Sequence, residues 1–406
     1  MSLYLGIDWS KNKHDVVVVN STGAIVASLV ISHSPQGFSQ LDHLRQHLGL
    51  RARDCVVGLE TAHNLLVDFL WNRGYEQVYV IPPYVTRSAR GRYRHSGART
   101  DQSDAYVLAN LLRTDRQHLY PWQPDQPLTR QLRAQVGLLR FLTQQSVRLS
   151  NRLQAVLWRY YPAATLVFDR LDQNISLAFL QAYPNPEAIQ SLSRSQFEQF
   201  AHQHGHYWQA KIVASFARLK QPQPHPDAHL AAIYQAEALQ LSQLLVPIVT
   251  AKKTVLGQIK HLYLAHPDQP IFASLPGLGD RLGPALLVKF GDDRRRFPTP
   301  NSIQALAGTC PVTVWSGKRK TVRFRRACDH QFRQITQLWA TKSLAQSVWA
   351  NSYYQQVRPR CGSQSHAIRC LANRWLAIAW TLWQNRLAYD EAFHLRQRQA
   401  RATQQS

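Results

Sequence analysis

The chain has 406 residues, of which 45% are hydrophobic, so it can form two or three domains with cores of their own and is too apolar for a disordered polymer. It carries 48 Lys and Arg against 24 Asp and Glu, a formal net charge of +24. This excess predicts polyanionic partners, and a small neutral substrate would not require it. The sequence contains no run of 18 apolar residues and no N-terminal signal pattern, so we expect a cytoplasmic protein without a membrane partner.

The first third of the chain has the pattern of an α/β domain with a mixed sheet. Short turns separate the first three predicted strands, which indicates an antiparallel meander. Helices and buried strands then alternate, which is typical of a sheet covered by helices. The predicted strands are 3–8, 15–20, 24–31, 55–60 and 78–81, and the predicted helices are 35–48, 60–73 and 101–113. We place this domain at residues 1–120.

The rest of the chain is predicted to be mainly helical. After a Pro-containing linker at 120–124, two long helices cover 128–160 and 227–266, and the apolar residues of the second repeat about every 3.5 residues, as in a coiled coil. They predict an antiparallel arm over 121–268 with an insertion at about 162–226. Either this arm dimerises or it packs as a helical hairpin on its own domain. A C-terminal domain at 269–395 and a frayed basic tail at 396–406 complete the predicted organisation.

The cysteines give no sign of a disulfide framework. They are odd in number and scattered, and they contain no Cys-x-x-Cys pair, so we expect a reducing compartment and no zinc site of the usual Cys spacing. The five are Cys55, Cys310, Cys328, Cys361 and Cys370.

Four acidic residues stand at positions where carboxylates can converge. Asp8 and Glu60 each end a predicted apolar strand, and Asp101 and Asp104 lie three residues apart at a predicted helix start, hence on one face. Each alone has a simpler explanation, such as a helix cap or a first-turn acid. Together they form an oxygen ligand set suited to Mg²⁺ or Mn²⁺, as used in two-metal phosphoryl transfer.

Two basic segments are candidate contacts to a phosphate backbone. One lies between Glu60 and Asp101, and the other follows a Ser-Gly turn at Ser316. A solvated loop is the alternative for the first segment. The residues are Arg87, Arg90, Arg92, Arg94 and Arg99 in the first segment, and Lys318, Arg319, Lys320, Arg323, Arg325 and Arg326 in the second.

Two further features concern the C-terminal region. Ser316, before a glycine and among cations, is a candidate nucleophile, although Ser-Gly is also a common turn. The segment 275–283 resembles the hairpin of helix–hairpin–helix motifs, in which backbone N–H groups near Gly277 and Gly279 bind a phosphate. A plain helix–helix turn is the alternative.

Taken together, these motifs resemble the DEDD transposases of bacterial insertion sequences related to the Piv and MooV DNA invertases, some of which are bridge-RNA-guided recombinases. The resemblance covers most of residues 4–115 and 270–392. Two features depart from it, namely the length of the 162–226 insertion and Thr309-Cys310, where a more apolar residue is typical. The matching motifs are Gly6-Ile7-Asp8, Gly58-Leu59-Glu60-Thr61, Arg99-Thr100-Asp101-Gln102-Ser103-Asp104-Ala105, Leu275-Pro276-Gly277-Leu278-Gly279, Ala307-Gly308, Pro311, Ser316-Gly317, Arg325-Arg326-Ala327 and Ala372-Asn373-Arg374.

The resemblance implies a RuvC-like (RNase H-type) first domain whose four acids hold Mg²⁺. It also implies that Ser316 joins covalently to DNA, in a centre composed from two sites, and that a structured guide RNA pairs with donor and target DNA. The implied assembly is a homodimer, or a tetramer in the synaptic complex, acting on the nucleoid. Rival hypotheses are a metal-dependent junction nuclease that uses the acids alone, and a non-catalytic nucleic-acid-binding protein. A sugar-kinase-like ATPase is disfavoured because no second Gly-rich phosphate loop follows Gly6-Ile7-Asp8.

Overall fold

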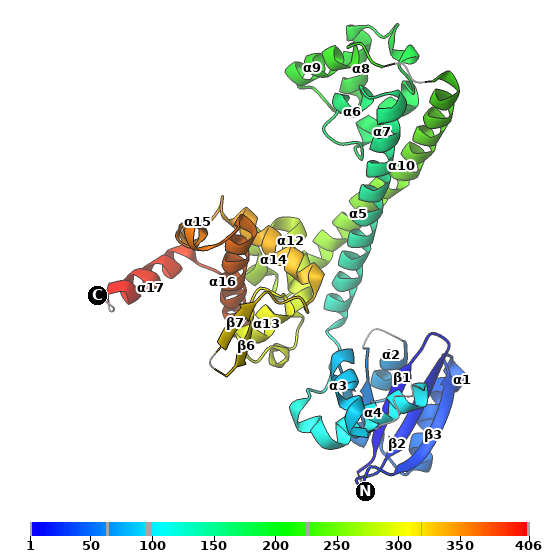
Figure 1. The fold of residues 1–406 in the computed structure, drawn as a ribbon, viewed down its shortest axis with the longest axis vertical. Coiled ribbons are helices and arrows are strands. Elements are labelled where there is room, and N and C mark those ends of the chain that lie inside the picture. Colours follow the sequence, from blue (N-terminus) through cyan, green and yellow to red (C-terminus); the bar gives the residue numbers. More distant parts are fainter. Residues whose placement is uncertain (1, 62–64, 94–99, 225–226, 318, 404–406) are drawn as a thin grey trace. The chain divides into compact units, whose positions relative to one another are not determined.

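The computed structural model describes residues 2–61, 65–93, 100–224, 227–317 and 319–403 (Figure 1). Its residue contacts divide the chain into two compact units, Met1–Asp125 and Gln126–Ser406. Arg94, Arg99 and Lys318, for which the sequence predicts phosphate contacts, lie outside the described residues.

The first unit contains a five-stranded mixed sheet in the order β3-β2-β1-β4-β5. Strands β1 to β3 form the predicted antiparallel meander, and β4 and β5 join β1 in parallel. The predicted mixed α/β arrangement is confirmed. The strands are β1 (Tyr4–Trp9), β2 (Lys13–Val19), β3 (Ile25–Ser32), β4 (Val56–Leu59) and β5 (Gln77–Val80).

Helices cover both faces of this sheet, and strand β2 explains why. Val16 and Val18 join the core that contains residues of α1 and α2, whereas Val17 and Val19 pack against Ala105 of α4. Successive side chains of a strand point to opposite faces, so an uninterrupted Val run suits a strand that is buried on both sides. The helices are α1 (Pro35–His47), α2 (Leu65–Asn72), α3 (Pro83–Tyr93) and α4 (Asp101–Asp115), with the 3₁₀ turns η1 (Ala52–Asp54) and η2 (Arg116–His118).

Helix α4 lies against the sheet more closely than a side chain at Gly6 would permit. A Cβ atom at Gly6 would stand 1.9 Å from the carbonyl oxygen of Ala105 and 2.5 Å from the backbone nitrogen of Ala109. A Cβ atom at Gly58, the register partner of Gly6 on β4, would stand 2.9 Å from a methyl carbon of Leu112 on the same helix. Two glycines side by side on parallel strands thus form the surface on which α4 rests.

The end of the first unit differs from the prediction. The Trp122 N–H donates to the carbonyl oxygen of Val78 at 2.6 Å, and Pro121 forms a bridge with Tyr79. These contacts attach the start of the predicted linker to strand β5. The division between the units therefore falls after Asp125, not after residue 120.

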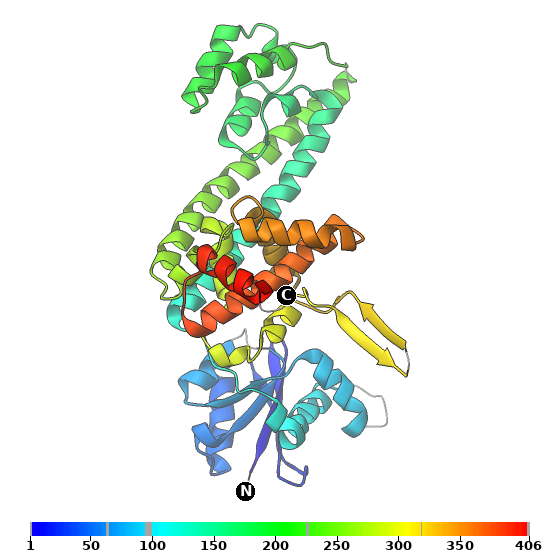
Figure 2. The ribbon, with the colours of Figure 1, turned by 90° about the vertical axis from the view of Figure 1, so that its left-hand side faces the viewer.

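The second unit is built on two long antiparallel helices, α5 (Pro127–Tyr160) and α10 (Ala228–Leu264), which lie side by side (Figures 1 and 2). Both lie where the sequence predicts them. Leu132 of α5 and Ile259 of α10 belong to the core of the C-terminal region. For this reason the arm and the C-terminal region form one unit, whereas the sequence predicts two domains that meet at residues 268 and 269.

The insertion between the arm helices folds into a small helical tip with its own core around Tyr161, Phe179 and Phe197. Its helices are α6 (Ala164–Val167), α7 (Asn174–Ala182), α8 (Arg194–Gln203) and α9 (Gln209–Leu219), with the 3₁₀ turn η3 (Glu187–Ile189).

A buried polar contact connects the tip to both arm helices. The Asp172 carboxylate accepts hydrogen bonds from the Ser146 hydroxyl at 2.9 Å and from the Lys252 ammonium at 3.2 Å. Burial alone would raise the pKa of Asp172, but the hydrogen bonds from Arg170, Ser146 and Lys252 outweigh it and lower that pKa to about 2. The carboxylate therefore stays charged and fixes where α5 and α10 meet.

The C-terminal region packs around the Trp-rich helix α16. Trp339, Trp375 and Trp383 are fully buried, and the Trp375 indole N–H donates to the Ser343 hydroxyl at 2.8 Å. Among the described residues no helix has the length and apolar character needed to span a membrane. The elements are α11 (Gln269–Ala273), α12 (Gly279–Phe290), η4 (Arg294–Arg296), α13 (Pro300–Leu306), β6 (Val312–Ser316), β7 (Arg319–Arg323), α14 (His330–Ser343), α15 (Val348–Val357), η5 (Arg358–Arg360), α16 (Gln364–Asn385) and α17 (Glu391–Thr403).

The close approach at Gly6 predicts a large cost for a single methyl group. Gly6→Ala should lower the free energy of unfolding of the first unit by about 2–4 kcal/mol, because the clash is with helix backbone that must move as a whole. Gly91→Ala is the matched control, since nothing lies within 4 Å of its Cβ position and alanine favours a helix. Calorimetric unfolding of the full chain measures both; equal effects of the two substitutions would contradict the packing argument.

Candidate active site

Asp8 and Glu60 lie at one edge of the sheet. In the parallel pair of β1 and β4, Ile7 is the partner of Leu59, so Asp8 and Glu60 come next along the two strands, where this pairing ends. Both are half-buried. The sequence predicts this arrangement, because the carboxyl ends of parallel strands meet at the same edge.

The face to which these acids point follows from the two glycines. Gly6 and Asp8 are two residues apart on β1, and Gly58 and Glu60 have the same spacing around the end of β4. Residues two apart on a strand share a face, and both glycines contact α4. Asp8 therefore lies on the α4 side of the sheet, and Glu60 continues the same alternation.

Helix α4 begins at Asp101 and carries the other two acids in its first turn. Thr100 is the N-cap, and its side-chain oxygen accepts from the Ser103 N–H at 3.1 Å while the Ser103 oxygen accepts from the Thr100 N–H at 3.1 Å. This reciprocal pair fixes the first helical residue. Asp104 immediately precedes Ala105, the residue that touches Gly6.

The other three acids act electrostatically on Asp8. The pKa of Asp8 is raised to about 7, first by burial and then by the negative charges of Asp104, Asp101 and Glu60, with a smaller effect of Asp15. The predicted acids are thus brought together. Carboxylates that repel one another in a partly buried site are a favourable environment for a divalent cation, which would remove the repulsion.

Two basic side chains already balance part of this charge. Arg90 of α3 forms a bidentate pair with Asp104, with Nε–Oδ1 at 2.9 Å and Nη2–Oδ2 at 2.8 Å. The Lys13 ammonium lies 3.2 Å from Asp101 and 3.7 Å from Asp15. The sequence predicts a phosphate contact for Arg90 and assigns no role to Lys13. Only the folded chain shows that each of these cations lies beside one of the predicted acids.

The remaining described residues of the first basic segment lie on α3. Arg87 is exposed, whereas Arg92 donates to the Asp115 carboxylate at 3.0 Å. Arg87 thus remains a candidate phosphate contact, while Arg90 and Arg92 have carboxylate partners within the unit.

Ser316 lies in the second unit, at the end of the first strand of a β-hairpin. The sequence predicts the Ser-Gly turn but not the two strands. Ser316 pairs with Arg319 across the turn, which begins at Gly317 with φ of +54°. Every residue of β6 and β7 is exposed except Val312 and Thr321, which are half-buried. Figure 2 shows the hairpin extending away from the helices of its unit.

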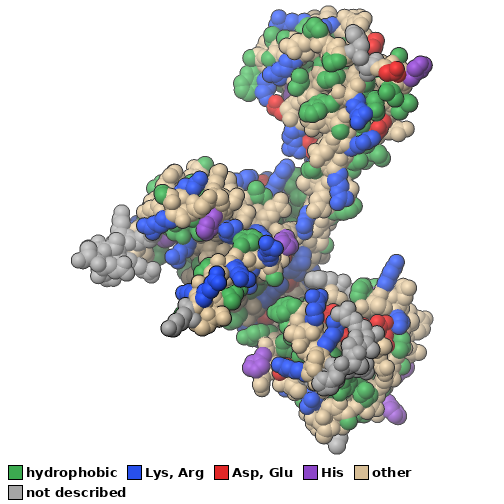
Figure 3. Space-filling view, in the orientation of Figure 1, with side chains coloured by type: hydrophobic (Ala, Val, Ile, Leu, Met, Phe, Trp, Pro, Cys, Tyr) green, Lys and Arg blue, Asp and Glu red, His purple; other side chains and the backbone are tan. Residues whose placement is uncertain are grey.

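Cationic side chains lie along this hairpin and the segment that follows it. Arg319, Lys320 and Arg323 are exposed on β7, Arg326 is exposed behind it, and Arg325 is half-buried and donates to the Cys310 carbonyl oxygen at 3.3 Å. The exposed Trp315 ring lies beneath the Lys320 ammonium at 5.2 Å. In Figure 3 the Lys and Arg side chains gather over this hairpin.

The base of the hairpin is attached firmly to α16. The Thr309 hydroxyl donates to the Asn373 side-chain oxygen at 2.8 Å, and the Gln304 amide donates to the Asn373 carbonyl oxygen at 2.8 Å. Gly308 has φ of +65°, and a Cβ there would lie 2.5 Å from Arg333 and 2.7 Å from the Cys328 sulfur. Thr309, which departs from the family pattern, is thus buried with its hydroxyl satisfied.

The predicted phosphate-binding turn at 275–283 is partly occupied by the protein itself. The Gly277 N–H donates to the Gln346 side chain at 2.7 Å, and a Cβ at Gly277 would meet the Ser343 nitrogen at 2.6 Å. In this structure the Gly277 N–H is therefore not directed at a ligand. Gly279 begins α12 with open space around it, and its phosphate contact remains a prediction.

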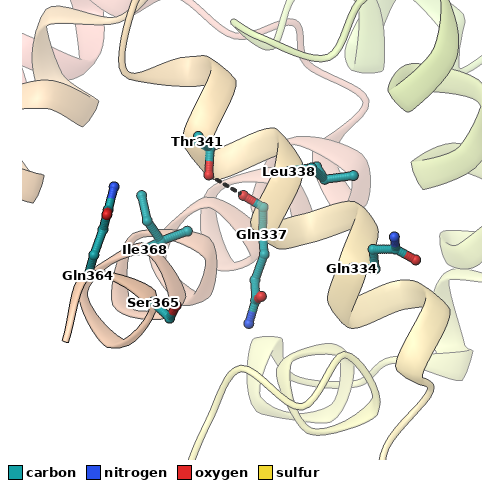
Figure 4. Close-up of a pocket in the computed structure, with 7 residues that line it drawn as sticks. All are labelled: Gln334, Gln337, Leu338, Thr341, Gln364, Ser365 and Ile368. Atoms are coloured by element: carbon teal, nitrogen blue, oxygen red, sulfur yellow. Dashed lines mark hydrogen bonds between the residues drawn. The ribbon is translucent and has the colours of Figure 1, made fainter. Parts of the chain in front are cut away.

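A shallow hollow between α14 and α16 is separate from all of these residues. Gln337, Leu338 and Thr341 line it from α14, and Gln364 and Ile368 line it from α16 (Figure 4). The Thr341 hydroxyl donates to the Gln337 carbonyl oxygen at 2.9 Å, so it is satisfied locally. The lining contains neither an acid nor a base.

Comparison with known families decides the identity. A family model for DEDD transposases of IS110, described as Transposase, matches residues 5–162, and one described as the Transposase IS116/IS110/IS902 family matches residues 269–355. The chain belongs to the DEDD transposases of insertion sequences. The two matched regions contain, respectively, the four acids and Ser316.

Similar proteins extend along most of this transposase. It is 29% identical over 400 residues, 96% of each chain, to a Streptomyces coelicolor protein whose name assigns it to transposition of the IS117 mini-circle. It is 25% identical over 297 residues, 72% of each chain, to the insertion element IS110 uncharacterized 43.6 kDa protein of the same organism. The insertion element IS900 uncharacterized 42 kDa protein of Mycobacterium paratuberculosis is 25% identical over 338 residues, 81% of this chain and 82% of that one. The transposase is therefore an enzyme that acts on DNA.

The raised pKa of Asp8 predicts how the stability of the transposase depends on pH. Between about pH 4 and 7 the folded state keeps a proton that the unfolded state has lost, so stability falls as the pH rises through this window. Asp8→Asn removes the penalty and should increase the free energy of unfolding at pH 8 by about 1–2 kcal/mol, a value reduced because Asp8 is only half-buried. At pH 4 the gain should vanish. Calorimetry in EDTA measures both; an equal gain at the two pH values would point to packing instead.

Proposed function

We propose that the transposase cuts and rejoins DNA through a covalent phosphoserine at Ser316, with Mg²⁺ or Mn²⁺ held by Asp8, Glu60, Asp101 and Asp104. The observation that carries this proposal is the electrostatic coupling of Asp8 to the other three acids. The exposed position of Ser316 on a basic hairpin supports the nucleophilic role. We further propose that the first unit is RuvC-like, since its acids lie at one edge of a mixed sheet.

The donor set fits a hard divalent cation. It consists of carboxylates, which Mg²⁺ and Mn²⁺ prefer, and its repulsion is the kind that a cation relieves. When bound, the cation would stabilise the charge that develops on the scissile phosphate. Arg90 and Lys13, which now balance Asp104 and Asp101, would then be free to contact phosphate oxygens.

In the proposed cleavage step the Ser316 oxygen attacks phosphorus and the bond from phosphorus to the 3′ oxygen breaks. The serine loses its proton, and the leaving oxygen gains one to become a 3′ hydroxyl. In the rejoining step a 3′ hydroxyl attacks the phosphoserine and releases Ser316. One phosphate ester is exchanged for another at each step, so no nucleotide hydrolysis is required. Arg319 and Lys320 lie close to Ser316 along the chain, and their positive charges would stabilise the negative charge that develops at phosphorus.

The proposed partners are inferred from the net charge of the chain and from exposed apolar residues on the arm. With a net charge of +24 the chain suits donor DNA, target DNA and a structured guide RNA, whose pairing would select the sites. Exposed apolar residues on the arm, including Phe141 and Val147 of α5 and Leu244 of α10, support pairing of protomers, as a dimer or as a tetramer in the synaptic complex. Such pairing would let acids and serine from different chains act on one phosphate. Because its substrate is DNA, we also propose that the transposase acts on the nucleoid, in the cytoplasm.

One observation favours a second candidate function. All four acids belong to the first unit, so the ligand set that we propose is complete without the serine hairpin. A junction nuclease that uses metal and water would need nothing else. The two candidates differ in whether Ser316 is required for cleavage. A non-catalytic binding protein would need neither the acids nor Ser316.

Metal binding should be visible as stabilisation. At pH 8, Mg²⁺ at about ten times its dissociation constant should raise the free energy of unfolding of the first unit by about 1–2 kcal/mol. Asp8→Asn and Glu60→Gln should abolish this rise, whereas Asp115→Asn, whose partner is Arg92, should keep it. Calorimetry of the full chain, with the first-unit transition identified by its response to Gly6→Ala, gives the readout. The same rise in all variants would exclude the four acids as the ligands.

The covalent intermediate is testable with a suicide DNA substrate that carries the element junction, together with RNA transcribed from the element's flanks and Mg²⁺. We expect labelled DNA to migrate with the protein on a denaturing gel. Ser316→Ala should reduce this adduct by at least about 1,000-fold, and Asp104→Ala should do the same. Thr313→Ala, on the same hairpin, is the control and should retain it. If the DNA is cut without forming an adduct, and this cleavage persists in Ser316→Ala, the nuclease would be established instead.

A further inference from the structure

Two cysteines and a histidine converge at the start of α16. The Cys361 sulfur, a ring nitrogen of His366 and the Cys370 sulfur all lie within 4.8 Å of one another. Their spacing, Cys-x₄-His-x₃-Cys, is not the spacing of common zinc fingers, so the sequence gives no zinc prediction here. The signal that would have found them is the pair His366 and Cys370, which are four residues apart and so share a helix face.

The backbone around these residues holds them together without an ion. The Ser363 hydroxyl accepts from the His366 N–H at 3.2 Å and so fixes the start of α16. Before it, the Cys361 N–H donates to the Arg358 carbonyl oxygen at 3.2 Å, and the Arg358 guanidinium donates to the Cys361 carbonyl oxygen at 3.4 Å. This turn brings the Cys361 thiol back to the helix face that carries the other two groups.

We propose that Cys361, His366 and Cys370 bind a zinc ion. Thiolates and imidazole are the ligands that select Zn²⁺ over Mg²⁺, so this site is chemically distinct from the four acids. A tetrahedral zinc with bonds of about 2.0–2.3 Å holds its ligand atoms about 3.3–3.8 Å apart, which small side-chain rotations achieve from the present positions. His366 is exposed and both cysteines are half-buried, so the fourth position faces solvent and takes water.

The ion would stabilise the part of the second unit that supports the serine hairpin. Arg369, the neighbour of Cys370, lies over the Phe324 ring at 4.6 Å, and Arg333 lies over the same ring at 4.5 Å. Phe324 immediately follows β7. Zinc at Cys370 would hold the first turns of α16 against the preceding 3₁₀ turn, and through Arg369 it would steady the base of the hairpin. The role is one of positioning.

The test uses the full-length chain, purified under reductant and stripped of metal. Co²⁺ is the probe, because thiolate ligands give tetrahedral Co²⁺ intense visible and charge-transfer bands. We expect one Co²⁺ per chain, displaced by one Zn²⁺. Cys361→Ser and Cys370→Ser should weaken binding by more than about 100-fold, since even partners outside the ligand set contribute about 10–100-fold. Cys328→Ser and Cys310→Ser, which change half-buried cysteines outside the cluster, should leave it unchanged.

A second pair of variants distinguishes ligand loss from misfolding. His366→Ala should lose the metal, whereas His366→Cys should keep it and strengthen the charge-transfer band, because it supplies a third thiolate. The two sulfur atoms also lie within 4.8 Å of each other, so a disulfide is the competing outcome. The proposal would be overturned if the reduced chain bound no stoichiometric metal, or if binding survived Cys361→Ser. It would also be overturned if the two thiols were lost on air oxidation while zinc is present. None of these readouts depends on DNA cleavage.

Discussion

The approach of helix α4 to strand β1 is the constraint on which the acidic site depends. Gly6 has no side chain, so the carbonyl oxygen of Ala105 lies where a Cβ would otherwise stand. Asp8 is two residues from Gly6, and Asp104 is one residue from Ala105, so the same contact sets the separation of the acids. Gly58 repeats the arrangement on β4 next to Glu60. The geometry of the charges is therefore determined by backbone packing, not by contacts among the acids themselves.

That packing works against stability at the site. Burial and three neighbouring carboxylates raise the pKa of Asp8 to about 7, which means that the folded chain holds mutually repelling groups together near neutral pH. Arg90 and Lys13 reduce the repulsion from Asp104 and Asp101. Sites that destabilise the fold in this way are commonly functional, because the unfavourable charge becomes favourable when a cation or a charged substrate binds.

Much of the first unit could be predicted from the sequence, because its signals are local. The strands carry continuous apolar runs, the predicted helix start at Asp101 is where α4 begins, and the acids follow strand ends in a countable register. The β6–β7 hairpin is harder to recognise: Val312-Thr313-Val314 does alternate apolar and polar residues, but most residues of both strands are exposed, so the pattern marks no buried face. The pairs of Arg90 with Asp104 and of Gly277 with Gln346 join residues far apart along the chain, and no local pattern encodes them. The cluster at Cys361 was missed for a related reason, since its ligands combine a turn with a helix.

The polar contact of Ser146, Asp172 and Lys252 fixes the alignment of the two arm helices. Because a charged pair inside an apolar seam allows only one alignment, α5 cannot slide along α10. Val136 is the last buried α5 residue of the C-terminal core and Leu153 is the first of the tip core, so 17 residues of helix, about 25 Å at about 1.5 Å each, join the two cores. Ser146 lies within this stretch, so the polar contact holds the two cores at one separation. A shift of the arm helices by one turn would move the tip by about 5.4 Å relative to the C-terminal core and would break this contact.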